Sequence, residues 1–148
     1  ETKLELFESF ISRAASQLKS MKIELGIKCH PREDINEYLA IANKYVTAFE
    51  LPKTILAAIM AVDAGVVMAS TVGLELLGAK RRIAQLEITN YGYVFDYIED
   101  SEVLKIPLEG DFDLSKLFGY SSDAAYFDEH IEKGKAIHNI VSVLIEGC

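Results

Sequence analysis

The stretch that decides the fold is residues 54–79, TILAAIMAVDAGVVMASTVGLELLGA, in which only Asp63 and Glu75 are charged. Small residues recur in this stretch at every fourth position. They are Ala57, Ala61, Gly65, Ala69 and Gly73. On a helix, this spacing forms a ridge of small side chains against which a second helix packs closely. We therefore predict that residues 54–79 form one buried central helix.

Two other structures compete for the same stretch. A strand hairpin would pair residues 54–62 with residues 66–72 around a turn at 63–65, and the valine-rich second arm favours strands. A transmembrane helix over residues 55–74 would be long enough, but it would place Asp63 near the bilayer centre, at a cost of about 3 kcal/mol. We expect no membrane association, and the choice between one helix and a hairpin stays open.

Asp63 is the acid in the middle of this apolar stretch. An acid in apolar surroundings must reach water, pair with a cation or take up a proton. Asp63 is therefore a candidate general acid or base, because burial raises the pKa of such a group. The alternative is a structural position in a hairpin turn or at the wet edge of a helix.

The residues before this stretch carry a helical pattern. Apolar side chains recur there at steps of three and four, which predicts a helix of about six turns that ends at Gly26. They are Leu4, Phe7, Ile11, Ala14, Leu18, Met21 and Leu25. Strict steps of three and four also suit a coiled coil, but we favour packing inside the domain. A second helix is predicted from Pro31 to Leu51, because proline is favoured in the first turn.

After Arg82 the apolar period changes to two, which is typical of strands. Residues 83–89, 93–98 and 103–108 alternate in this way, and turn residues separate them. The pattern predicts three strands in an antiparallel meander.

A helical turn is expected at residues 113–116. A C-terminal helical region is expected over residues 123–133, with an interruption at Gly134 and a continuation to residue 144. The predicted fold is α+β in a single domain, residues 1–148. It has an N-terminal layer of long helices (1–79), a small antiparallel β-meander with an acidic loop, and a C-terminal helix packed on the core (80–148).

The chain has 148 residues and a net charge of −8, and the negative charge is concentrated in one segment. Residues 96–133 contain eleven acids and three bases. Such a surface repels phosphate backbones, so we expect no nucleic-acid binding. The two cysteines are too few for a disulfide scaffold or a structural zinc site. With no recognisable leader at the start, we expect a cytoplasmic protein.

Nine of the fourteen Phe and Tyr residues lie within residues 91–127, beside the acids. Rigid aromatic side chains bordered by carboxylates suit a protein partner with a basic segment. The predicted binding surface consists of Tyr91, Tyr93, Phe95, Tyr97, Tyr120 and Tyr126. The alternative is that this aromatic face packs on the helices, with the tyrosine hydroxyls reaching water.

The chain contains none of the common phosphate-loop, dinucleotide, nucleophile-elbow or zinc-protease motifs. Asp128 and His130 lie in the densest titratable cluster, and with Asp63 they are the candidates for acid–base chemistry. The alternative for that cluster is a solvated helix face.

Cys29 and His30 come just before the second predicted helix. A metal site there would need His30 together with Glu33 and Glu37. No further ligand has metal-site spacing, so we predict no metal and no cofactor. In the interpretation that we favour, His30 lies near the helix start and Glu33 complements the helix dipole.

The sequence thus favours a non-catalytic, acidic protein-interaction or regulatory module that self-associates. The alternative is an enzyme that binds a small molecule or a metal in a pocket between the helices and the tyrosine-rich strands. We lean away from an enzyme, since no catalytic constellation stands out.

Overall fold

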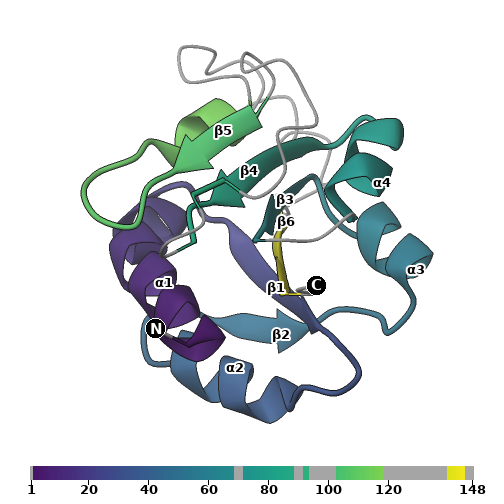
Figure 1. Cartoon of the computed structure of the whole chain (residues 1–148), viewed down its shortest axis with the longest axis horizontal. Helices are drawn as coiled ribbons and strands as arrows, with labels where there is room; N and C mark the ends of the chain where they lie inside the picture. The colour runs from purple at the N-terminus through teal and green to yellow at the C-terminus, as the bar shows by residue number, and fades with distance from the viewer. Residues whose placement is uncertain (1, 69–71, 89–91, 94–102, 119–139, 146–148) are drawn as a thin grey trace.

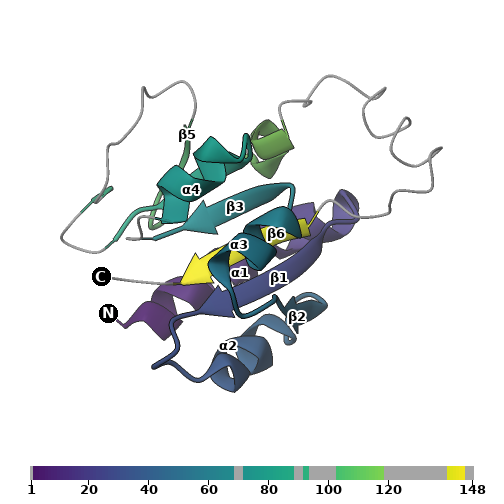
Figure 2. The ribbon, with the colours of Figure 1, turned by 90° about the vertical axis from the view of Figure 1, so that its right-hand side faces the viewer.

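The computed structural model of the chain describes residues 2–68, 72–88, 92–93, 103–118 and 140–145. Six strands in this part form one sheet, in the order β2-β1-β6-β3-β4-β5 (Figure 1). All neighbouring strands pair in parallel, and Figure 2 shows β1, β6 and β3 running side by side in the same direction. The strands are β1 (Glu24–Cys29), β2 (Ala48–Glu50), β3 (Ala64–Val67), β4 (Arg82–Leu86), β5 (Val103–Ile106) and β6 (Ile140–Ile145).

From α1 to β4, helices alternate with the strands along the chain, and the helices cover both faces of the sheet (Figure 1). They are α1 (Lys3–Ser20), α2 (Ile35–Ala42), α3 (Ile55–Met60), α4 (Val72–Gly78) and the 3₁₀ helix η2 (Leu114–Phe118). Residues of α1, α2 and η2 share one core cluster, and residues of α3 and α4 share a second. Ala84 belongs to the first cluster and its neighbour Ile83 to the second. The two clusters therefore lie on opposite faces of the sheet, as expected for parallel strands.

The predicted fold was wrong in both its sheet and its helical layer. The strands described form a parallel sheet, not an antiparallel meander, and α1 is the one long helix among those described, with 18 residues. Parallel strands that are buried on both faces have nearly continuous apolar runs. Such runs are hard to distinguish from buried helices by periodicity. For this reason the strands β1, β2 and β3 lie in the segment, residues 1–79, that was predicted to be mostly helical.

The helix α1 begins with a reciprocal cap and ends earlier than predicted. The Thr2 hydroxyl accepts a hydrogen bond from the Glu5 N–H (3.1 Å), and the Glu5 carboxylate accepts one from the Thr2 N–H (3.3 Å). The helix ends at Ser20, because Lys22 adopts a positive φ of 56° that turns the chain away. Its apolar stripe is confirmed, since the side chains at the stripe positions inside α1 pack in the core.

The residues predicted to end the first helix and to form the second one belong partly to strands. Gly26 lies inside β1, and a Cβ at this position would come within 2.5 Å of Leu51 Cδ2. Glycine therefore allows the chain that follows β2 to pack directly on β1. The second predicted helix is divided into α2, which Asp34 caps and Asn43 ends, and the strand β2.

Residues 54–79 form neither one helix nor a hairpin. The elements α3, β3 and α4 follow one another in this stretch, so the regular spacing of small residues runs through three separate elements. Gly65 lies in β3, and a Cβ on it would come within 2.5 Å of Leu76 Cδ1 in α4. The small size of Gly65 therefore allows a helix to pack closely on a strand, whereas the predicted ridge would have allowed two helices to pack together. In the part of the chain that the structure describes, no helix is both long and apolar enough to cross a membrane.

The C-terminal half also departs from the prediction. The strands β4 and β5 are neighbours in parallel, with Ile83 opposite Val103. Of the middle predicted strand, 93–98, the structure describes only Tyr93. The strand β6 lies where the end of a helix was predicted and pairs with both β1 and β3. The predicted helical turn is present as η2.

Two side chains of α1 hold the chain after β5 against the helix. Arg13 donates through Nη1 to the carbonyl of Pro107 (2.7 Å). The Gln17 amide donates to the carbonyl of Phe112 (2.7 Å) and accepts from the N–H of Leu114 (2.6 Å). These bonds join segments that are far apart in the sequence, and they fix η2 on the core.

Candidate ligand-binding site

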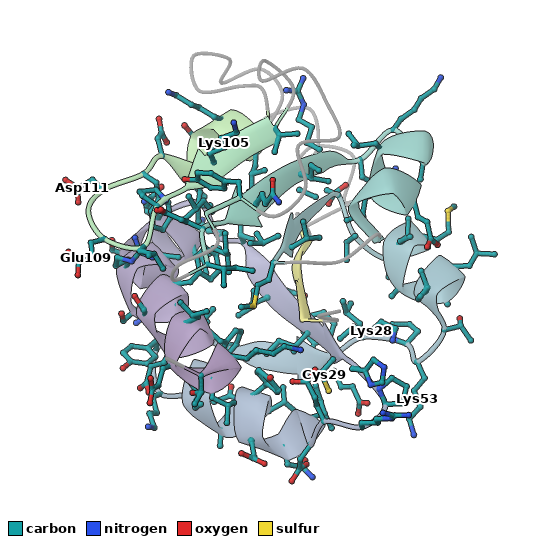
Figure 3. The ribbon with its side chains drawn as sticks, in the orientation of Figure 1. Lys28, Cys29, Lys53, Lys105, Glu109 and Asp111 are labelled. Carbon is teal, nitrogen blue, oxygen red and sulfur yellow. The ribbon has the colours of Figure 1, made fainter. Side chains whose placement is uncertain are left out.

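A pocket of about 260 Å³ opens at the carboxyl ends of β1 and β2. Figure 3 shows Lys28, Cys29 and Lys53 together at this edge of the molecule. Open parallel sheets bind ligands at the carboxyl ends of their strands, where the following loops lead into helices. The lining residues are Lys28, Cys29, His30, Pro31, Glu33, Ile35, Glu50, Leu51 and Lys53.

The order of the strands places this pocket on the outer side of β1. The strand β2 lies at this edge of the sheet, whereas β3, β4 and β5 extend the sheet beyond β6 in the opposite direction. The residues that line the pocket come from β1, β2 and the segments that follow them.

Lys28 and Cys29 end β1 and point to opposite faces, because side chains alternate along a strand. Lys28 is only 7% exposed, which is rare for a lysine. A buried charge has to be compensated by its surroundings, and Lys28 does interact with another group. Lys28 is therefore the buried cation of the pocket lining, whereas Lys53 is exposed.

His30 follows β1 directly, and its ring is held by the next turn. The Nδ1 atom accepts a hydrogen bond from the N–H of Arg32 at 3.1 Å. In a neutral imidazole with Nδ1 accepting, the proton is on Nε2. His30 therefore offers an N–H donor through Nε2, which suits an oxygen-rich ligand.

Glu33 is already committed to other side chains. Its Oε2 accepts a hydrogen bond from the Tyr38 hydroxyl, and its Oε1 lies 3.6 Å from Nζ of Lys3. Burial, and then the hydrogen bond to Glu33, raise the pKa of Tyr38 well above its ordinary value. The hydroxyl therefore stays protonated and keeps donating to the carboxylate.

The first turn of α2 also borders the pocket, since Ile35 is both its first residue and part of the lining. The carboxylate of Asp34 caps this end by accepting from the Asn36 N–H at 2.9 Å. The aligned peptide dipoles place a partial positive charge at such an end, which favours anions nearby.

The pocket lining carries charges of both signs. Lys28 and Lys53 contribute positive charge, and Glu33 and Glu50 contribute negative charge. Glu33 is paired with Lys3, which does not line the pocket, so the charge of Glu33 opposes an anion less than an unpaired carboxylate would.

The Cys29 thiol is part of the lining but is not activated. Its Sγ lies 3.7 Å from the Glu33 carbonyl oxygen, to which it donates. Burial, and then the charge of Glu33, raise the pKa of this thiol above its ordinary value. A nucleophilic cysteine needs a lowered pKa, so the surroundings of Cys29 do not support that chemistry.

Of the predicted site residues, the structure describes Asp63 and Tyr93, and neither of these two lines the pocket. Asp63 precedes β3 and is half-buried at the amino end of that strand, whereas the pocket is at the carboxyl ends of β1 and β2. Tyr93 lies under the Lys105 ammonium group, with Nζ 5.4 Å from the ring centroid. The other predicted residues lie outside the described part of the chain. They are Tyr91, Phe95, Tyr97, Tyr120, Tyr126, Asp128 and His130.

The described residues contain no group of three His, Cys, Asp or Glu side chains that could hold a metal ion. His30, Glu33 and Glu37 therefore do not form such a group. Glu33 is held by Tyr38 and Lys3, and Nδ1 of His30 is held by a backbone N–H.

Comparisons of the chain with protein-family models, with curated proteins and with solved structures found no match. Lys28 and Lys53 were not among the site residues predicted from the sequence. The signal that could have found Lys28 is local, because an apolar run ends in Lys28–Cys29–His30 just before a capped helix. No local signal links Lys53 to it, because the two meet only through the pairing of β1 with β2.

Proposed function

We propose that this chain binds a small anionic molecule, with a phosphate or carboxylate group, in the pocket at the carboxyl ends of β1 and β2. The proposal is carried by one observation, the buried Lys28 with His30 and Lys53 around a pocket at this edge of a parallel sheet. The volume of about 260 Å³ lies just below the usual range of roughly 300–1,000 Å³ for ligand pockets. A small metabolite fits this size better than a polymer.

The test is a titration of the ¹⁵N-labelled chain with inorganic phosphate and with acetate, at constant ionic strength. We expect saturable shifts of the backbone amide signals of Cys29, Glu33 and Ile35. If these signals do not move, or move no more than those of exposed loops elsewhere, the proposal is wrong.

The charge requirement is tested with a matched pair of lysine variants. Lys53→Met removes an exposed cation from the pocket lining, and Lys19→Met removes another exposed cation, near the C-terminal end of α1. We expect Lys53→Met to weaken binding by roughly threefold to tenfold, as for a nearby but solvated charge. Equal effects of the two variants would show that binding reflects total charge and not this pocket.

A second candidate is the interaction module that self-associates, which the sequence favours. One feature supports it, since Leu56 and Met60 are 73% and 63% exposed on successive turns of α3. Exposed apolar side chains that adjoin one another are typical of contact surfaces. A cytoplasmic location and a protein partner with a basic segment are parts of this second candidate.

Native mass spectrometry and sedimentation velocity test the second candidate. We expect a dimer that becomes a monomer in the Leu56→Lys, Met60→Lys double variant. A wild-type chain that stays monomeric at about 100 μM, well above the dissociation constants of most stable dimers, would reject self-association.

A further inference from the structure

We infer that Glu33 determines the charge preference of the pocket, and that Lys3 keeps the pocket favourable to anions by pairing with Glu33. This inference rests on the proposed function, because it concerns the same pocket. Lys3 was not among the residues that the sequence suggested for a site, and Glu33 was considered there only as a metal ligand. Lys3 belongs to the first turn of α1 and does not line the pocket.

The geometry gives Glu33 this role. In the described part of the chain, two acids line the pocket, and Glu33 is the more buried of them, since Glu50 is exposed. Its Oε1 is shielded from water and has no hydrogen-bond partner among the described residues, and the Lys3 ammonium lies 3.6 Å away. Its Oε2 receives the Tyr38 hydroxyl. The cation that pairs with this carboxylate, Lys3, therefore comes from another element.

The consequence for binding follows from the charges alone. With Lys3 present, the Lys3–Glu33 pair is neutral, so Glu33 does not oppose an anion in the pocket. Without Lys3, the negative charge of Glu33 would oppose an anion in the same pocket. Without the charge of Glu33, Lys3 would add to the attraction. The sign of the effect thus differs between the two partners, whereas loss of a merely structural ion pair would weaken binding in both cases.

The experiment measures phosphate affinity by the same amide titration in four chains: wild type, Lys3→Met, Glu33→Gln, and the double variant. Glutamine keeps the acceptor for Tyr38 and removes the charge, so the local structure is preserved. We expect Lys3→Met to weaken phosphate binding by roughly threefold to tenfold, and Glu33→Gln to strengthen it by a similar factor. The double variant should bind within about twofold of wild type, because the pair is neutral in both.

Each outcome is informative. If wild type binds phosphate and Glu33→Gln weakens binding or leaves it unchanged, the inference is wrong while the proposed function stands. If wild type shows no saturable binding, the proposed function itself fails. Tyr38→Phe serves as a folding control, because it removes a contact to Glu33 without changing any charge, and its phosphate affinity should stay close to that of wild type.

Discussion

Leu76 in α4 occupies the space that a side chain on Gly65 in β3 would need. An ideal Cβ on Gly65 would lie 2.5 Å from Leu76 Cδ1, and Leu76 is fully buried. Real Cβ atoms do not approach other atoms so closely, so the helix and the strand can pack at this distance only with glycine. The contact joins α4 to the centre of the sheet.

Gly65→Ala should therefore destabilise the fold by about 1–3 kcal/mol, the range for overpacking a core. Urea denaturation followed by circular dichroism measures the change. Gly78→Ala is the matched control, because nothing lies within 4 Å of a Cβ there, and it should be neutral or slightly stabilising. A second substitution, Leu76→Ala, should add less destabilisation to Gly65→Ala than to wild type. Full additivity of the two substitutions would argue against this contact.

Gln17→Met should weaken the attachment of η2 to α1. Methionine matches the length of glutamine but leaves the Phe112 carbonyl and the Leu114 N–H without the bonds of 2.7 and 2.6 Å that they make with Gln17. We expect a loss of about 1–3 kcal/mol in the free energy of unfolding. Hydrogen exchange at Leu114 should accelerate more than exchange in β1. Unchanged exchange at Leu114 would contradict this role of Gln17.

Tyr38→Phe should change the response of stability to alkaline pH. The pKa of Tyr38 is raised in the folded state, so the folded chain keeps this proton where the unfolded chain, with a pKa of about 10, loses it. The stabilisation is therefore fully present below about pH 10 and decreases as the pH rises above that value. Urea denaturation between pH 8 and 11 should show a smaller decline for Tyr38→Phe than for wild type. Parallel declines would mean that Tyr38 ionises normally.

The rate at which iodoacetamide alkylates the Cys29 thiol should rise with pH around a midpoint that is higher than for an ordinary thiol. Burial and the charge of Glu33 raise its pKa, so the rate, followed by mass spectrometry of the Cys29 peptide, should reach half its plateau above the ordinary value of about 8.5. Poor access alone would slow the reaction without moving the midpoint. The urea-unfolded chain provides the reference midpoint, and a folded midpoint at or below it would be incompatible with this environment.

Periodicity predicted the first helix well because α1 is long and amphipathic. Phe7, Ile11, Ala14 and Leu18 all have their predicted buried positions. Periodicity failed over residues 54–79, where three short elements replace one expected helix. Short apolar segments fit a strand in a parallel sheet as well as a buried helix, because both are covered on all sides.

The sheet order could not be predicted from any local pattern. The strand β6 lies between β1 and β3 although it comes last in the chain, and residues 103–106 pair in parallel with β4. Alternation in the sequence led to an antiparallel meander because consecutive strands usually neighbour each other in space. The direction and partners of a strand depend on hydrogen bonds to distant segments, which alternation does not specify.

The sequence by itself determined the net charge, the buried stripe and cap of α1, and the apolar character of residues 54–79, because each depends on residues that are close together in the chain. Only the tertiary structure decided the pocket. The pairing of Ile27 with Glu50 brings the carboxyl ends of β1 and β2 together, and with them Lys28 and Lys53. The contact between Lys3 and Glu33 likewise exists only because α1 and α2 pack on the same face of the sheet.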